Sequence, residues 1–171
     1  GKMGPTLAVL AKRAAEAAFH SLDVVAVSRF RDMLTRVWLE SHGVTTITAD
    51  LLEFSQVRAL PDSENVVHLV GVKFGTQENP SQTWAANTLV PANIVQRYPD
   101  ARLVVLSTGN VYPAVPVKSG GALENQPLLP VGEYANSAVG RERVVEYLSR
   151  KEETPVAFMR LSYAVDLRYG V

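Results

Sequence analysis

The first residues that could perform chemistry are the glycines at the start of the chain. Gly1-Lys2-Met3-Gly4 stands directly before an apolar pattern typical of a helix. A helix N-terminus presents unpaired backbone N–H groups and the positive end of the helix dipole, and glycines allow a phosphate to come close to the backbone. Gly1, Lys2, Met3 and Gly4 therefore predict a pyrophosphate-binding turn, with glycines that only cap or pack a helix end as the alternative.

A second candidate site, Ser28 and Arg29, stands at the end of the first predicted strand. In a dinucleotide-binding unit this position faces the adenosine ribose, where an acidic residue would bind the 2′-hydroxyl. A hydroxyl beside a guanidinium suits a 2′-phosphate instead. The pair favours NADP over NAD, unless Arg29 is only a solvated charge that opens the next helix.

The composition argues against several other kinds of protein. Seventeen basic and seventeen acidic residues among 171 give zero formal net charge, so nucleic acid or an anionic membrane is not expected as a partner. Cysteine is absent and the three histidines lie in separate segments, so we expect no metal site. The apolar runs are far shorter than the roughly 18 to 20 residues that cross a bilayer, and no secretory or lipidation signal is visible, which favours the cytoplasm.

Strand-like and helix-like segments alternate along the chain, which predicts an α/β fold with a parallel sheet. In the first half, the pattern predicts helices over residues 5–19, 31–41 and 51–59 and strands over 23–27, 44–47 and 65–70. In the second half, it predicts a helix over 81–98 that Pro91 should kink or divide, a helix over 133–150, and strands over 102–106 and 155–160.

One long segment lacks this periodicity. Residues 109–132 contain four prolines and four glycines. Irregular loops of this length are uncommon in compact domains and often functional. We interpret the segment as a wall of an active site.

The chain resembles the extended short-chain dehydrogenase/reductase family, the epimerases, dehydratases and dehydrogenases of nucleotide sugars and related compounds. The resemblance covers essentially the whole sequence. It rests on Gly1 and Gly4 as the later glycines of a GxxGxxG turn, Asp50-Leu51, the strand 66–69, Asn87, the segment 107–112, Glu124, Pro130, Tyr134 with Glu142 behind it, and Arg160.

The resemblance implies roles for individual residues. Thr108 matches the catalytic Ser/Thr that hydrogen-bonds the substrate oxygen, and Tyr134 matches the general acid/base tyrosine. Asp50 and Leu51 match the pair beside the adenine, and Gly71 lies in the loop that passes the cofactor. The structural alternatives are that Thr108 satisfies loop backbone groups and that Tyr134 anchors a helix to the core.

Two further residues are expected to be structural. His68 is in the middle of a strand, where a satisfied core histidine is more common than a catalyst. Asn87 should hold the kinked helix against neighbouring backbone.

The chain departs from the family pattern at the position four residues after the tyrosine. The family has a lysine there, whose ammonium lowers the tyrosine pKa and holds the nicotinamide ribose. Here that position is Ala138, and Arg141 lies about 10 Å beyond Tyr134 along the helix, which argues against direct substitution. Lys73 and Lys118, both in candidate active-site loops, are two other cations that could reach the site.

The resemblance also implies a Rossmann-type doubly wound parallel sheet that is incomplete. The first strand and most of the substrate-binding region of the family have no counterpart in residues 1–171, which we expect to form one partial dinucleotide-binding domain. In the strand order 3-2-1-4-5-6 the absent strand is central. Strands 24–27 and 66–70 should then each lack a neighbour and not pair with each other, and an isolated chain should be poorly stable.

The leading hypothesis is an NADP- or NAD-dependent enzyme of epimerase, dehydratase or dehydrogenase type, which transfers hydride at a secondary alcohol or ketone of a sugar-like molecule. The alternative is a dinucleotide-binding or sensing protein of the same fold with weakened catalysis, as the missing lysine would permit. The helices after Ser81 and Gly132 resemble those that pair in homodimers of the family.

Overall fold

The computed structural model of the chain describes residues 3–162, so Gly1 and Lys2 of the predicted glycine turn lie outside the described residues. These residues fall into two compact units, one up to Ala59 and one from Leu60 onward. Each unit contains parallel strands connected by helices, so the expected α/β class is confirmed.

The first unit begins with helix α1 (Met3–Ala17) and continues through β1 (Val25–Ser28), α2 (Met33–Ser41), β2 (Thr45–Thr48) and α3 (Phe54–Arg58). Strands β1 and β2 form a parallel pair, with Ser28 opposite Thr48. The core of this unit is built from Val9, Leu39 and Val44, which are nearly inaccessible to solvent. Helix α2 starts where the Asp32 carboxylate accepts the Leu34 N–H at 3.0 Å, an N-cap that satisfies one otherwise unpaired donor.

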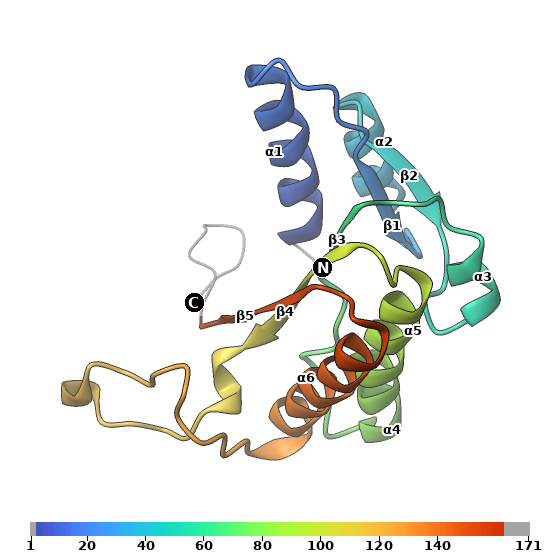
Figure 1. Ribbon diagram of the computed structural model, residues 1–171. Helices are drawn as coiled ribbons and strands as arrows, with labels where there is room; N and C mark the ends of the chain where they lie inside the picture. The colour runs from blue at the N-terminus through green and yellow to red at the C-terminus, as the bar shows by residue number, and fades with distance from the viewer. Residues whose placement is uncertain (1–2, 163–171) are drawn as a thin grey trace. The chain divides into compact units, whose positions relative to one another are not determined.

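The second unit contains a three-stranded parallel sheet in the order β3-β4-β5 (Figure 1). Its strands are β3 (Asn65–His68), β4 (Arg102–Thr108) and β5 (Val156–Leu161). Helices α4 (Pro80–Trp84) and α5 (Val90–Arg97) lie against α6 (Gly132–Glu152), and α6 also packs on β4 and β5. The buried side chains Leu103 and Val105 alternate along β4, as a strand with a covered face requires.

The expected division of the helix near Pro91 takes the form of a π-helical segment, η1 (Ala85–Leu89), between α4 and α5. Pro91 lies in the first turn of α5, where a missing N–H costs no helical hydrogen bond. The π-helical segment carries the fully buried side chain of Asn87.

The predicted loop over residues 109–132 is irregular apart from two short 3₁₀ turns, η2 (Gly109–Val111) and η3 (Val117–Ser119). Near its end, the Leu129 N–H donates to the Val111 carbonyl at 3.0 Å. This bond ties the end of the loop to its beginning.

Strands β1 and β3 do not pair with each other, as expected. Within the described part of the chain, β1 pairs only with β2, and β3 pairs only with β4. Each of the two strands therefore has one edge without a ladder.

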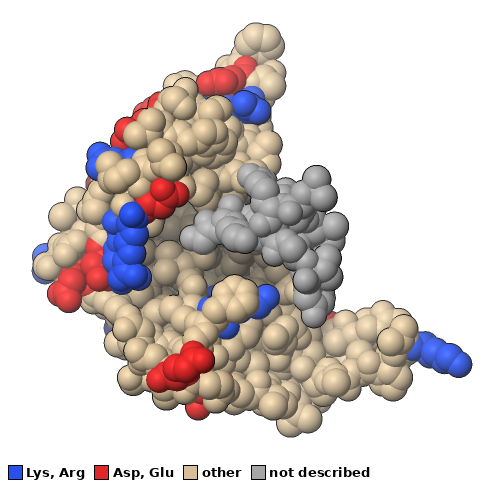
Figure 2. Space-filling model, turned by 180° about the vertical axis from the view of Figure 1, so that it is seen from behind, with Lys and Arg blue, Asp and Glu red and all other residues tan. Residues whose placement is uncertain are grey.

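The described helices include none that is both long and apolar enough to span a bilayer. Figure 2 shows basic and acidic side chains interspersed on the face that it presents, in keeping with the zero formal net charge.

Candidate functional site

Four of the residues predicted to bind a cofactor meet at one edge of the first unit. Ser28 ends β1 and is followed by Arg29, while Asp50 and Leu51 follow β2. Because β1 and β2 are parallel, their carboxyl ends open at the same edge, the place where α/β sheets bind ligands. Met3 and Gly4, which were also predicted to bind the cofactor, form the first residues of α1.

The Arg29 guanidinium lies 3.8 Å from the Asp50 carboxylate, and both side chains are largely open to solvent. An exposed ion pair at this distance contributes only about 0 to 1 kcal/mol, because water screens it. Arg29 can therefore leave Asp50 for a stronger anion at small cost.

Thr108 and Tyr134, the predicted catalytic pair, both belong to the second unit. Thr108 ends β4 and is buried, and its hydroxyl accepts the Asn110 N–H at 3.2 Å, the loop-satisfying role that is the structural alternative. Tyr134 lies half-buried in the first turn of α6. The hydrogen bonds found among the described residues include none between Thr108 and Tyr134.

A buried polar cluster connects α6 to the loop after β3. The Asn87 amide accepts the Val72 N–H at 2.8 Å and donates to the Val72 carbonyl at 3.0 Å. It also donates to the Ser137 hydroxyl at 2.8 Å, which in turn donates to the Tyr134 carbonyl at 2.9 Å. Asn87 thus holds neighbouring backbone, as expected, and in addition connects it to the turn of α6 that carries Tyr134.

Arg141 completes this cluster, and its place differs from the expectation. Its Nη1 donates to the Leu106 carbonyl at 2.7 Å, and its Nη2 and Nε donate to Oδ1 and the backbone carbonyl of Asn87 at 2.9 and 3.2 Å. The long side chain extends from α6 to the end region of β4, and burial lowers its pKa. Distance along the helix axis alone therefore underestimated its reach.

Gly71 lies against this guanidinium. A Cβ atom at position 71 would come within 2.5 Å of Nη2 of Arg141 and 3.1 Å of Oδ1 of Asn87. Glycine is thus required for the close approach of the loop to the cluster. The spacing of Ser137 and Arg141, one helical turn apart, is the sequence signal that could have revealed the cluster.

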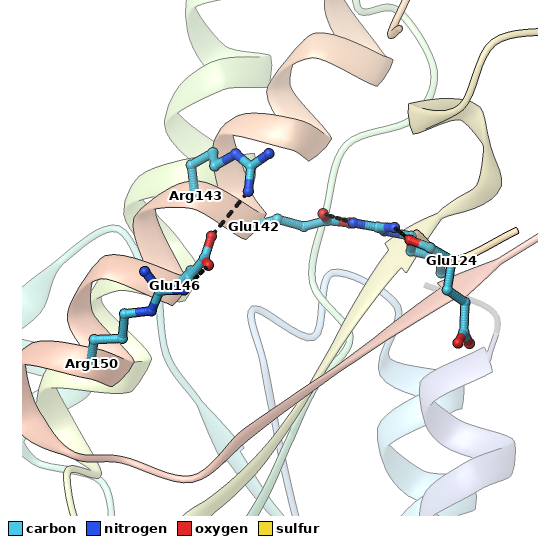
Figure 3. Close-up of polar contacts among 6 residues, drawn as sticks. Glu124, Glu142, Arg143, Glu146 and Arg150 are labelled. Atoms are coloured by element: carbon cyan, nitrogen blue, oxygen red, sulfur yellow. Dashed lines mark hydrogen bonds and ion pairs between the residues drawn. The ribbon is translucent and has the colours of Figure 1, made fainter. Parts of the chain in front are cut away.

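A second cluster anchors the irregular loop (Figure 3). Arg160 donates from Nε and Nη2 to the two carboxylate oxygens of buried Glu142, at 3.0 and 2.8 Å. The Ser107 hydroxyl also donates to that carboxylate, and Arg160 reaches the Tyr112 hydroxyl at 2.6 Å and the Glu124 carbonyl at 3.2 Å. The bond to Glu142 raises the pKa of Arg160. This cluster joins β5, α6 and the 109–132 loop.

His68 is a core residue, as expected, but it is not fully satisfied. Its side chain is 3% exposed and its Nε2 has no hydrogen-bond partner among the described residues. Burial, together with the charge of Arg141, lowers the pKa of His68 to about 3. Lys73 and Lys118 are both exposed.

Residues 4–165 match the model of the NAD dependent epimerase/dehydratase family. The chain belongs to this family. No curated protein sequence matches it.

Solved structures of similar fold include DesIV, a dTDP-glucose 4,6-dehydratase from Streptomyces venezuelae with NAD and TYD bound, at 19% identity and a TM-score of 0.80 over 94% of this chain and 52% of that one. The UDP-Glc/GlcNAc 4-epimerase from Campylobacter jejuni has 19% identity and a TM-score of 0.72 over 89% and 49% of the two chains. RMD from Pseudomonas aeruginosa, complexed with NADPH, has 19% identity and a TM-score of 0.66 over 82% and 54%. The chain therefore spans about half the length of these neighbours, and the Rossmann-type fold is confirmed.

Proposed function

We propose that this chain forms the dinucleotide-binding half of an NAD(P)-dependent enzyme that transfers hydride at a secondary alcohol or ketone of a sugar-like molecule. The observation that carries the proposal is the meeting of Ser28, Arg29, Asp50 and Leu51 at the carboxyl ends of two parallel strands. This edge fits a dinucleotide because it combines a buried apolar residue with hydroxyl, guanidinium and carboxylate groups. The family match over residues 4–165 supports the same assignment.

The nicotinamide, when bound, accepts or returns the hydride. Thr108 holds the substrate oxygen through a hydrogen bond, for which its hydroxyl turns away from Asn110. Tyr134 takes the hydroxyl proton while the carbon loses hydride and becomes a ketone, and it returns the proton in the reverse direction. Gly71 lets the loop after β3 pass close to the cofactor.

The bound cofactor is proposed to be NADP, with NAD as the alternative. Structural neighbours have been solved with either NAD or NADPH, so the fold accommodates both kinds. The exposed Arg29 guanidinium beside Ser28 favours the 2′-phosphate, because Asp50 holds it only weakly.

The cofactor assignment is tested by the dissociation constants of NADPH and NADH, measured by nicotinamide fluorescence at moderate salt. We expect NADPH to bind more tightly, and Arg29→Ala to remove most of the difference, because a charge-assisted bond contributes about 1.5 to 3 kcal/mol, or tenfold to a hundredfold in affinity. Arg31→Ala, which removes a neighbouring exposed guanidinium, should leave the preference intact. Equal affinities in the unaltered chain would contradict the assignment.

The activity is tested in the longer polypeptide with UDP-glucose and dTDP-glucose as probes. Bound reduced cofactor should appear or disappear on addition of a substrate, and Tyr134→Phe should abolish this turnover while cofactor binding persists. The second candidate function, a dinucleotide-binding or sensing protein, is favoured by Ala138 at the lysine position of the family. It predicts cofactor binding with no consumption of reduced nicotinamide for any sugar nucleotide.

A homodimer through α4, α5 and α6 is also proposed. These helices leave large apolar or aromatic side chains exposed, with Trp84 at 37%, Leu89 at 56% and Tyr147 at 66%. Light scattering over a range of protein concentrations tests this, and a mass of one chain throughout would contradict it.

A further inference from the structure

The guanidinium of Arg141 is a buried charge without a countercharge nearby. The residue is 7% exposed, and its three hydrogen bonds all go to neutral amide oxygens, those of Leu106 and Asn87. Among the described residues no carboxylate lies within ion-pair distance of it. An unpaired buried charge costs several kcal/mol. The residue is therefore more than a structural filler of the space between α6 and β4.

The groups whose charge acts on Arg141 identify what it can serve. The charges that raise its pKa against the effect of burial are those of Tyr134 and Glu142. Glu142 is already held by both nitrogens of Arg160. Tyr134 is then the remaining anionic group for the guanidinium to stabilise.

The geometry of α6 supports this pairing. Arg141 follows Tyr134 by seven residues, which is close to two helical turns, so both lie on nearly the same face. Helical side chains lean toward the N-terminus, which carries a long side chain at 141 back toward residue 134. The hydrogen bonds from Arg141 to Asn87, from Asn87 to Ser137 and from Ser137 to the Tyr134 carbonyl fix the two residues in one rigid cluster.

The position between them holds no competing cation. Ala138 lies one turn after Tyr134 and is 1% exposed, so it is packed on every side. Arg141 is the cation that the buried cluster contains.

We propose that Arg141 is a positioning residue that supplies a fixed positive charge to Tyr134 and favours its phenolate form. The proposal rests on the proposed function in one respect, that Tyr134 is the group that exchanges the proton. In this arrangement the charge comes from two turns along α6 and is held by Asn87 and the Leu106 carbonyl. It also accounts for Gly71, because any side chain there would displace the guanidinium.

The test follows phenolate absorbance near 295 nm during a pH titration of the 171-residue chain. The curve for Tyr134→Phe is subtracted from the curve for the unaltered chain, which isolates Tyr134 from the other five tyrosines. Arg141→Met should move the isolated midpoint to higher pH by about one unit, a tenfold change in the ionisation constant. Arg143→Met, which removes an exposed guanidinium from the same helix, should leave it in place. A folded Arg141→Met protein with an unchanged midpoint would overturn the proposal.

Because Arg141→Met also removes three hydrogen bonds, two further variants separate charge from structure. Arg141→Lys keeps a cation and should keep most of the midpoint. Ala138→Lys combined with Arg141→Met moves the cation one turn closer into the space that the guanidinium leaves, and it should return the midpoint to lower pH. A neutral Arg141→Gln chain that folds and titrates like the unaltered chain would contradict the proposal even if Arg141→Met does not fold.

Binding of NADPH to the same preparations, measured by fluorescence, distinguishes the two hypotheses. Failure of the unaltered chain and the longer polypeptide to bind NADPH and NADH contradicts the proposed function whatever the titration shows. An unchanged midpoint in a chain that binds NADPH contradicts only the role of Arg141.

Discussion

Asn87 uses both ends of its side-chain amide inside the protein, and this makes it sensitive to substitution. Asn87→Leu would leave the Val72 N–H and carbonyl, the Ser137 hydroxyl and the Arg141 guanidinium without their shared partner. We expect the free energy of unfolding to fall by about 3 kcal/mol or more, because several buried groups lose hydrogen bonds together. Urea unfolding measures the change. Gln96→Ala, at an exposed position of α5, should change it by no more than about 0.5 kcal/mol. A similar small change in Asn87→Leu would show that water replaces the amide.

His68 makes the stability depend on pH in a defined direction. The unfolded chain takes up a proton at this histidine below about pH 6.5, whereas the folded chain, with its pKa lowered to about 3, does not. The unfolded state therefore binds more protons in this window, and the free energy of unfolding contributed by His68 falls by about 1.4 kcal/mol for each pH unit as the pH decreases.

Unfolding in urea at about pH 7 and pH 5 measures this dependence. The unaltered chain should lose about 2 kcal/mol more between these two conditions than His68→Leu, which cannot titrate. His42→Gln, at a less buried histidine, provides the matched control and should keep the loss. Equal losses in the unaltered chain and His68→Leu would show that His68 becomes protonated without unfolding.

At this scale the sequence predicted side chains better than their partners. Asp50, Thr108 and Tyr134 could be singled out because residue type and position after a strand or at a helix start carry information. The buried role of Arg141 could not, because it depends on where Asn87 and Leu106 lie in three dimensions. A charged residue in a helix is most often solvated, and sequence spacing alone does not indicate burial.

Two ion pairs on α6 offer a direct comparison at the scale of elements (Figure 3). Glu142 is buried and pairs with Arg160 of β5 through two bonds, whereas Glu146 pairs with Arg143 on the same helix in the open. A double-mutant cycle with Glu142→Gln and Arg160→Met should give a coupling energy of about 2 kcal/mol or more, because a buried charge that loses its partner is costly. The cycle with Arg143→Ala and Glu146→Ala should give less than about 0.5 kcal/mol.

The same variants report on the irregular loop. Because Arg160 also binds Tyr112 and the Glu124 carbonyl, Arg160→Met should speed proteolytic cleavage within residues 109–132, while Arg143→Ala should not. Equal coupling energies in the two cycles, or an unchanged cleavage rate, would mean that the loop is held by other contacts.

Element types followed from the sequence, while their ends did not. Strand 65–70 was predicted two residues beyond the end of β3 at His68, because Leu69 and Val70 continue the apolar run without continuing the ladder. The π-helical segment escaped prediction because Ala85–Leu89 has a composition that an ordinary α-helix would also accept. The irregular stretch over 109–132 was recognised from its prolines and glycines, whose backbone preferences are local.

At the scale of the whole molecule, hydrogen bonding between strands is uneven. Strand β4 has a partner on both sides, but β1 and β2 have only each other. Amide hydrogen exchange followed by mass spectrometry should therefore show the slowest exchange in peptides covering residues 102–108 and faster exchange over residues 25–28 and 45–48. Protection of β1 equal to that of β4 would indicate that another strand covers its free edge.

The separation into two sheets was expected from the sequence through the position of an absent central strand, which local patterns alone do not show. Hydrophobic periodicity indicates that 24–27 and 66–70 are strands, but strand order depends on contacts between distant segments. The division of the described residues into two compact units was not predicted.

The π-helical segment makes this region more sensitive to chain length than to composition. Each residue of an α-helix turns it by about 100°, so deletion of one residue from 85–89 would let the helix become regular and rotate everything after it by that angle. The face of α5 that carries Val90, Ile94 and Val95 would leave the core. A sequence one residue shorter here could keep every side chain named above and still lose the surface on which α6 rests.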